Sequence, residues 1–426
     1  MNFDNTTHDP SLPANCLTHE LPNGLRVLLL PSSSQVVYCG IAVKAGSRHE
    51  QPGEEGLAHF CEHLSFKGTR RRSALQIINA LEAVGGELNA FTGKEDTVYY
   101  AATTRQHLRR AVSVLLDIVF QSQYPQHEVE KECEVVCDEI DSYEDSPSEL
   151  IFDEIENFLF EGHPLGHNIL GTSQRVRSFC QENVQRFASR YYRPENCVLF
   201  VSGQVDMGTL VKMIGKMDGY DFRDSNDDRQ SLKQHSLQPS AVPAPLITLH
   251  RGTHQAHVMM AARTFPASDE RRWSLFLLNN ILGGPGLNSR LNLALRERRG
   301  LVYTVESAMT TYSDTGVWGV YFGCDPHDVS LCRRLVTREL QRLIDHPLTD
   351  AQLLKAKQQL RGQLTIGAEN REQQSLDMAR SFLHEQRVRT LKDVLAHVDA
   401  LSAADLQHLA AQLLSPERLT TLIYDS

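Results

Sequence analysis

The chain has 426 residues, which is too long for one ordinary hydrophobic core and predicts at least two domains. Its 41% hydrophobic and 23% charged residues are typical of a soluble globular protein, and it lacks the run of about eighteen apolar residues that a membrane span needs. A formal net charge of −10 argues against nucleic acid as the main partner, because Arg70-Arg71-Arg72 with Lys67 is the only tight basic cluster.

The N-terminus and the cysteines bear on location. Residues 1–9 lack the basic and apolar stretches of a secretory signal. Nine cysteines, an odd number without framework spacing, favour free thiols in a reducing compartment. We therefore expect a cytoplasmic protein without membrane attachment, unless a targeting peptide has been removed.

The first predicted elements are strands at 25–30 and 36–43, followed by a helix at 56–66. On that helix His59 and His63 are four residues apart, so both imidazoles lie on one face and can offer nitrogen ligands to zinc. Glu62 shares the face, where a carboxylate can hold a metal-bound water and accept its proton. The order H-x-x-E-H is that of the inverzincins.

Other interpretations of this helix remain open. The same residues fit a partly exposed helix face that carries polar side chains. Cys61 lies inside the motif and could act as a thiolate, but a buried free cysteine usually packs as a small hydrophobe, and we expect packing. A hydrolytic zinc site also needs a third protein ligand from elsewhere in the chain.

A hairpin is predicted next. Residues 85–92 form a strand that a turn reverses into residues 97–100. An exposed edge strand can bind an extended peptide through main-chain hydrogen bonds, and this strand carries Asn89-Ala90-Phe91. The alternative is that Gly85-Gly86 only permits a tight turn.

Residues 128–143 form an acid-rich predicted helix that can supply the third ligand. Glu132 and Glu139 are two turns apart and share a face. The alternative is a solvated acidic surface. Cys133 and Cys137 on this helix have no second cysteine pair at zinc-site spacing, so we expect them in the core.

The second half repeats the first. Strands at 246–264 and helices at 329–344 and 350–366 follow the order of the earlier strands and of the helices at 108–120 and 128–143. Polar residues at 221–245 predict a linker. The predicted fold class is α+β, with two tandem homologous domains, each a mostly antiparallel sheet packed against helices: 1–220, the linker 221–245, and 246–426.

The motif and several later blocks resemble the pitrilysin, insulysin and mitochondrial processing peptidase family of zinc peptidases. The similarity covers nearly the whole chain, in the order 59–69, 85–92, 163–172 and 196–203, with Glu139 at the separation of the family's third ligand. It implies one zinc per chain bound by His59, His63 and Glu139, and Glu62 as the general base.

The resemblance also implies roles for residues outside the motif. Arg296 and Tyr303, seven residues apart in the second half, would anchor substrate and stabilise the transition state. Glu132 would orient a ligand or the water. Asn89 and Ala90 would bind substrate.

The expected activity is that of a zinc-dependent endopeptidase that hydrolyses peptides or unfolded polypeptides through a Glu-activated, zinc-bound water in a closed chamber. Four-domain relatives build such a chamber in one chain, so we expect this two-domain chain to dimerise with itself or with a related chain. Two other classes remain: an assembly subunit that keeps the fold, and a hydrolase of non-peptide amides.

Overall fold

The structure, a computed structural model, describes residues 16–217 and 245–425, which form two compact units. Among these residues, unit 1 contains 16–140, 168–217 and 368–390, and unit 2 contains 141–167, 245–367 and 391–425. Within the described ranges no helix combines the length and apolar character needed to cross a membrane.

Unit 1 is built on a six-stranded sheet in the order β1-β2-β6-β3-β5-β4. β2 and β6 are parallel, and the other neighbouring strands are antiparallel. β4 is the last strand in this order and therefore forms one edge of the sheet. The strands are β1 (Leu17–Glu20), β2 (Arg26–Pro31), β3 (Val36–Val43), β4 (Glu87–Thr92), β5 (Thr97–Thr104) and β6 (Cys197–Gly203).

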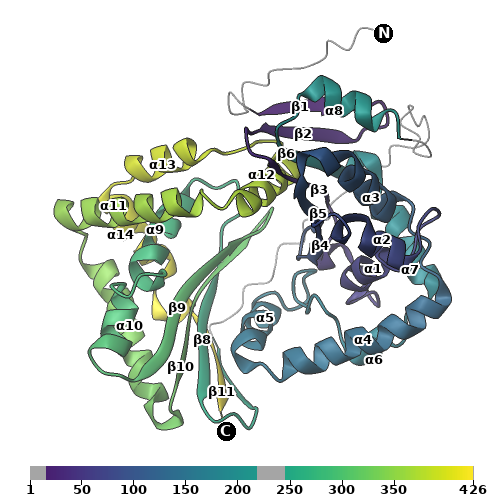
Figure 1. The fold of residues 1–426 in the computed structure, drawn as a ribbon. Coiled ribbons are helices and arrows are strands. Elements are labelled where there is room, and N and C mark those ends of the chain that lie inside the picture. Colours follow the sequence, from purple (N-terminus) through teal and green to yellow (C-terminus); the bar gives the residue numbers. More distant parts are fainter. Residues whose placement is uncertain (1–15, 218–244, 426) are drawn as a thin grey trace. The chain divides into compact units, whose positions relative to one another are not determined.

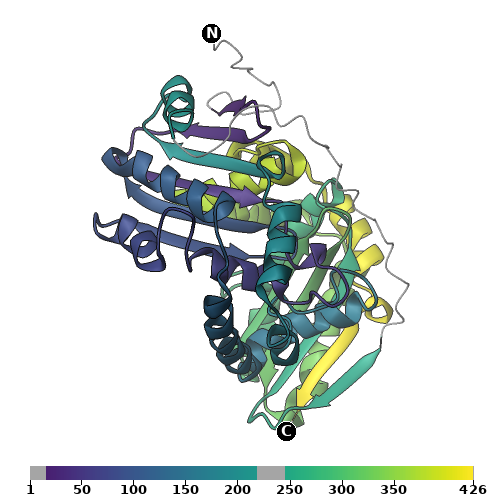
Figure 2. The ribbon, with the colours of Figure 1, turned by 90° about the vertical axis from the view of Figure 1, so that its right-hand side faces the viewer.

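Helices cover both faces of this sheet because alternate residues of the central strands point to opposite sides. Val27, Leu29 and Ile41 pack into the larger core with the helices near them in sequence, whereas Leu28 and Ala42 face α12 (Arg371–Glu385). Figure 2 shows the strands of this sheet side by side, with α12 in yellow-green beyond them. The other helices are α1 (Leu57–Ser65), α2 (Ala74–Glu82), α3 (Leu108–Phe120), α4 (Gln126–Glu144, which continues into unit 2), α6 (Ser173–Val176), α7 (Gln181–Tyr191) and α8 (Met207–Ile214).

Unit 2 has a five-stranded sheet in the order β7-β11-β8-β10-β9 (Figure 1). Its strands are β7 (Leu246–His250), β8 (Ala256–Thr264), β9 (Val302–Thr311), β10 (Gly316–Cys324) and β11 (Thr420–Asp425). One face packs on α5 (Pro147–Leu159) through Met259, Ala261 and Tyr424. The other face packs on the remaining helices: α9 (Arg271–Gly283), α10 (Val329–Asp345), α11 (Asp350–Gly367), α13 (Leu391–Ala400) and α14 (Ala403–Leu413).

The two sheets repeat one topology. β7 and β11 are parallel, as β2 and β6 are, and the next three strands are antiparallel in both sheets. β9 therefore occupies in unit 2 the edge position that β4 occupies in unit 1. The α+β class and the repeated architecture predicted from the sequence are confirmed.

The compact units differ from the predicted domain boundaries at two helices. α5 precedes residue 220 but packs in unit 2, and α12 follows residue 246 but packs in unit 1. Each sheet has a second apolar face that needs a cover, and in each unit a helix from the other half of the chain supplies it. Of the predicted linker 221–245, all but Pro245 lies outside the described residues.

Candidate metal centre and substrate-anchoring residues

α1 holds the histidine pair in a fixed orientation. Gly56 precedes the helix with φ 96, and a Cβ there would lie 2.6 Å from the carbonyl oxygen of Leu170, so this position requires glycine. The Glu50 carboxylate accepts hydrogen bonds from the backbone nitrogens of Gly56 (3.0 Å) and Ala58 (2.7 Å). These bonds satisfy free donors at the helix N-terminus and anchor α1.

His59, His63 and Glu139 converge on one point. Their potential ligand atoms all lie within 4.8 Å of one another. His59 Nε2 is 3.7 Å from Glu139 Oε1, and His63 Nε2 is 3.4 Å from Glu139 Oε2. Four ligands at zinc distances from a tetrahedral ion are about 3.3–3.6 Å apart, so these separations suit three ligands of a shared zinc.

Glu132 fixes the orientation of one imidazole. Its Oε1 lies 2.9 Å from His63 Nδ1, and its Oε2 forms an ion pair of 2.6 Å with Lys67 Nζ. A proton on Nδ1 that is donated to Glu132 leaves the Nε2 lone pair facing Glu139. Burial raises the pKa of Glu132, but hydrogen bonds from His63 and Lys67 outweigh it and lower this pKa.

The two histidines differ in their surroundings. Burial, and then the neighbouring His63, lowers the pKa of His59 to about 4, so this imidazole is neutral and its nitrogen is free to bind a metal. Burial also acts to lower the pKa of His63, but hydrogen bonds with Glu132 and Glu139 raise it to about 9, so metal binding at Nε2 has to displace a proton. The donor set of two imidazoles and one carboxylate fits zinc.

Glu62 lies beside the three ligands and outside the ligand cluster. It is 8% exposed, and the Thr92 hydroxyl donates to its Oε2 at 2.5 Å. Burial raises the pKa of Glu62, and the Thr92 hydrogen bond opposes this rise. A buried carboxylate that is held by a single donor retains lone pairs that can accept another proton.

Sequence reasoning missed Lys67 and Thr92. Lys67 follows His63 by four residues, and in the sequence it is only part of a basic cluster. Thr92 is the last residue of β4, at the end of a block that was considered for main-chain binding. Neither residue type signals a contact with a carboxylate that comes from a different element.

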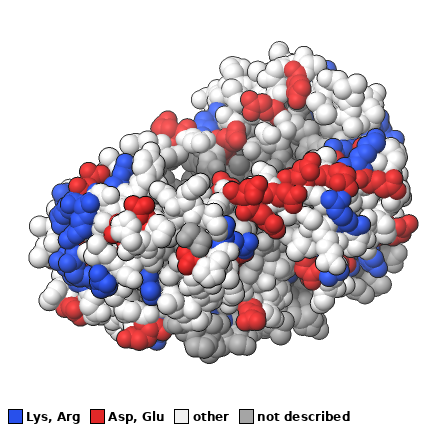
Figure 3. Space-filling view, turned by 90° about the horizontal axis from the view of Figure 1, so that it is seen from below, with Lys and Arg blue, Asp and Glu red and all other residues white. Residues whose placement is uncertain are grey.

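The acidic helix α4 has an exposed acidic face and also carries the candidate ligand Glu139. α4 buries Val129, Cys133 and Val136, while Glu132 and Glu139 point toward α1. Figure 3 shows a band of acidic side chains on the face it views, and the outward residues of α4 are rich in acids: Glu130, Glu134, Asp138, Asp141 and Glu144.

The cysteines near the site are packing residues. Cys61 is fully buried, and burial raises the pKa of its thiol to about 12. Cys133 and Cys137 lie in the same core, as expected. All nine cysteines are free thiols in the structure.

The predicted substrate contacts on β4 lie at a sheet edge. Among the described strands β4 pairs only with β5, and Asn89 and Ala90 stand opposite Tyr100 and Tyr99. Asn89 is exposed and Ala90 is half-buried. The other side of this strand can therefore accept hydrogen bonds from an extended chain.

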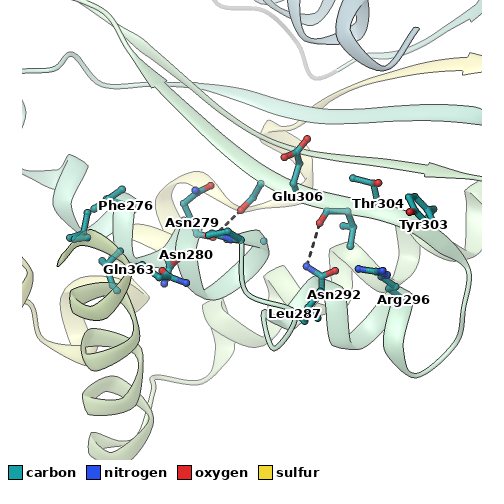
Figure 4. A pocket seen from close by; sticks show the side chains of 17 residues that line it. Phe276, Asn279, Asn280, Leu287, Asn292, Arg296, Tyr303, Thr304, Glu306 and Gln363 are labelled. Atoms are coloured by element: carbon teal, nitrogen blue, oxygen red, sulfur yellow. Dashed lines mark hydrogen bonds between the residues drawn. The ribbon is translucent and has the colours of Figure 1, made fainter. Parts of the chain in front are cut away.

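Arg296 and Tyr303 lie together in unit 2. Arg296 belongs to η4 (Asn292–Glu297), a π-helical segment, and its guanidinium lies 5.7 Å from the centre of the Tyr303 ring. Tyr303 is 80% exposed on the edge strand β9, which excludes a core role. Both side chains line a pocket (Figure 4).

Comparisons with known sequences agree with these features. Residues 26–173 match the family model for insulinase (peptidase family M16), and residues 178–360 match the model for the peptidase M16 inactive domain. An uncharacterised zinc protease of Streptomyces coelicolor is 35% identical over 405 residues, covering 92% of this chain and 86% of the relative. The uncharacterised zinc protease YmxG of Bacillus subtilis is 31% identical over 406 residues, covering 95% and 97%.

Solved structures share the fold. A protease from Helicobacter pylori superimposes with a TM-score of 0.90 at 22% identity, over 97% of this chain and 100% of the other. A peptidase M16 inactive domain from Pseudomonas fluorescens has a TM-score of 0.85 at 17% identity, over 96% and 97%. From the sequence matches, the chain belongs to the M16 family of peptidases, in the group of short bacterial members.

Proposed function

We propose that the chain is a zinc-dependent endopeptidase that hydrolyses peptides or unfolded polypeptides and holds one zinc through His59, His63 and Glu139. The observation that carries the proposal is the convergence of both imidazole Nε2 atoms on the Glu139 carboxylate, at 3.7 and 3.4 Å, with Glu62 beside them. When bound there, zinc supplies Lewis acidity toward a water and a peptide carbonyl.

The chain's own residues move the proton. Glu62 accepts a proton from the attacking water at its carboxylate and delivers it to the leaving amine. Thr92 keeps Oε2 of Glu62 occupied, which leaves Oε1 available to accept that proton. Glu132 positions His63 through Nδ1 and is itself held by Lys67.

Each unit has groups that can bind substrate. The edge of β4, at Asn89 and Ala90, pairs with an extended main chain, which selects unfolded segments with little demand on sequence. Arg296 and Tyr303 offer a guanidinium and a hydroxyl that can stabilise the oxyanion of the tetrahedral intermediate. A dimer, with a second copy or a related chain, would enclose these groups in a chamber. The nine free cysteines favour the cytoplasm.

Substitution Glu62→Gln tests the assigned roles. The variant should bind zinc as the unchanged protein does and lose roughly 10²–10⁴-fold in kcat, the usual contribution of a general base. Elemental analysis and cleavage of a quenched peptide series measure the two effects. Loss of zinc from Glu62→Gln, or undiminished zinc in Glu139→Ala, would reverse the assignment. Cleavage of non-peptide amides but of no peptide would favour an amide hydrolase.

A further inference from the structure

Unit 2 contains a pocket that occupies the same place in its fold as the candidate metal site occupies in unit 1. The pocket has a volume of about 590 Å³, within the range of ligand sites. Its walls come from α9 and the loop after it, η4, the edge strand β9 and α11 (Figure 4). In unit 1 the corresponding elements are α1, the edge strand β4 and α4.

The correspondence extends to single positions. α9 follows β8 as α1 follows β3, and α11 follows α10 as α4 follows α3. Phe276, Asn279 and Asn280 line the pocket with the same spacing that His59, Glu62 and His63 have. Gln363 lines it too, and counted from the first residue of its helix it stands where Glu139 stands in α4. An aromatic ring and three carboxamides thus replace the metal-binding set.

Asn280 is the side chain that points to a ligand. It is 7% exposed and lines the pocket, yet its carboxamide has no hydrogen-bond partner among the residues that the structure describes. The neighbouring amides are engaged: Asn279 Oδ1 accepts from Trp318 Nε1 at 3.0 Å, and Asn292 Nδ2 donates to Ser289 Oγ at 2.9 Å. Buried polar groups are almost always paired, so a free carboxamide in the wall of a pocket takes its partner from the pocket itself, either water or a ligand that displaces the water.

The loop after α9 holds Asn280 in place. A Cβ on Gly284 would lie 2.4 Å from Asn280 Oδ1, and one on Gly283 would lie 2.4 Å from the backbone nitrogen of Ser307 on β9. Glycine at both positions lets the loop lie directly on the carboxamide and on the strand. The Asn280 amide is therefore presented in a preorganised position.

We propose that this pocket binds an amide group of a polypeptide and holds it without cutting it. Asn280 donates from Nδ2 to the amide oxygen and accepts at Oδ1 from the amide N–H, and the free edge of β9 runs beside it. In Figure 4 Asn280 and Gln363 lie at one end of the pocket and Arg296 and Tyr303 at the other. The ligand class rests on the proposed function, because a peptide substrate is what the other unit would bind.

Photo-cross-linking tests the site separately from catalysis. Glu62→Gln protein with bound zinc is irradiated with a benzophenone-labelled, alanine-rich peptide, and with the same peptide carrying a central glutamine. Mass spectrometry should find cross-links in residues 276–307 and 360–364. Asn280→Leu should reduce them roughly tenfold, the effect of losing about one hydrogen-bond pair. Cross-links on residues 87–100 should not change. Asn288→Leu, on the same loop but outside the pocket wall, is the matched control.

Each outcome has a defined meaning. If Asn280→Leu reduces cross-linking of both peptides equally, the ligand is a main-chain amide. If it reduces cross-linking of the glutamine peptide alone, the ligand is a side-chain amide. Undiminished cross-linking of both peptides in Asn280→Leu, or an equal loss in Asn288→Leu, overturns the proposal. If Asn280→Leu does not fold, Gln363→Leu on the half-buried face of α11 replaces it. Failure of the unchanged protein to cleave any peptide refutes the proposed activity and leaves this binding result standing.

Discussion

Hydrogen bonds from outside the motif set the geometry of the candidate metal site at the residue scale. Glu62 and His63 are adjacent in sequence, but each is held by a partner from another element: Thr92 of β4 for the first and Glu132 of α4 for the second. The motif supplies the reactive groups, and these partners decide which atoms of each group remain free.

Thr92→Val should lower kcat about tenfold or more, because one hydrogen bond to a charged group is lost and Glu62 can turn away. Zinc content and KM should stay near their original values. Thr92→Ser retains the hydroxyl and should recover most of the activity. Steady-state kinetics on a quenched peptide measure the three proteins, and a serine variant as impaired as the valine variant would argue that the methyl group matters instead.

Glu132→Gln and Lys67→Met should each weaken zinc binding by roughly 10–100-fold, the usual cost of losing a partner that orients a ligand. Titration against a competing chelator measures the affinity. Lys131→Met is the matched control, because Lys131 is exposed and pairs with Glu128 on the surface of α4. Equal effects of Lys67→Met and Lys131→Met would indicate a general charge effect.

At the scale of elements, α12 shows how distant sequence completes unit 1. Its apolar residues cover the second face of the sheet, and its polar side holds the turn between β4 and β5. Arg380 Nε and His384 Nε2 lie 3.0 and 2.7 Å from Asp96 Oδ2, and Asp96 is fully buried. This turn follows Thr92, so the docking of α12 supports the strand that contacts Glu62.

Asp96→Asn should destabilise the protein by about 3 kcal/mol, because a buried ion pair loses its charge. Burial raises the pKa of Asp96, but the bonds from His384 and Arg380 outweigh it, so the folded pKa lies below the ordinary 3.8. The contribution is complete above the unfolded pKa and is lost as pH falls through the folded pKa.

Denaturant unfolding between pH 7 and pH 3 measures this effect. The difference in the free energy of unfolding between the original protein and Asp96→Asn should shrink as the solution is acidified below about pH 4. Asp141→Asn, at an exposed position of α4, should track the original protein throughout. If the difference in unfolding free energy stays constant with pH, the loss of stability in Asp96→Asn comes from altered packing and not from the lost charge.

At the scale of the whole molecule, the candidate metal ligands belong to unit 1 and the Arg296 and Tyr303 pair belongs to unit 2. If a dimer forms composite sites, the pair of one subunit serves the zinc of the other. Mixing inactive Glu62→Gln with Tyr303→Phe would then place both lesions in one site of each mixed dimer and leave the other site intact.

Dissociation and random reassociation of the two variants should restore activity to about a quarter of the original value, because half of the dimers are mixed and each has one good site. Mass spectrometry confirms subunit exchange. No recovery despite confirmed exchange would mean that the pair acts within its own chain or has no catalytic role.

Local patterns in the sequence were sufficient to predict the elements of the site. Helical spacing predicted α1 and α4, and strand alternation predicted β2, β3 and the β4–β5 hairpin. The repeat of these patterns predicted two similar sheets. Residues on adjacent turns of one helix form a local feature, so His59, Glu62 and His63 could be named together as site candidates.

Tertiary structure alone decided the contacts between elements that are far apart in sequence. The sequence by itself determined the fold class, the motif and the acidic helix, because each depends on spacing within one segment. The pairing of Glu132 with Lys67 and His63, the hydrogen bond from Thr92, the exchange of α5 and α12 and the free amide of Asn280 depend on which faces meet. The packing of helices on the two apolar faces of each sheet, and not any local pattern, decides which of these elements come into contact.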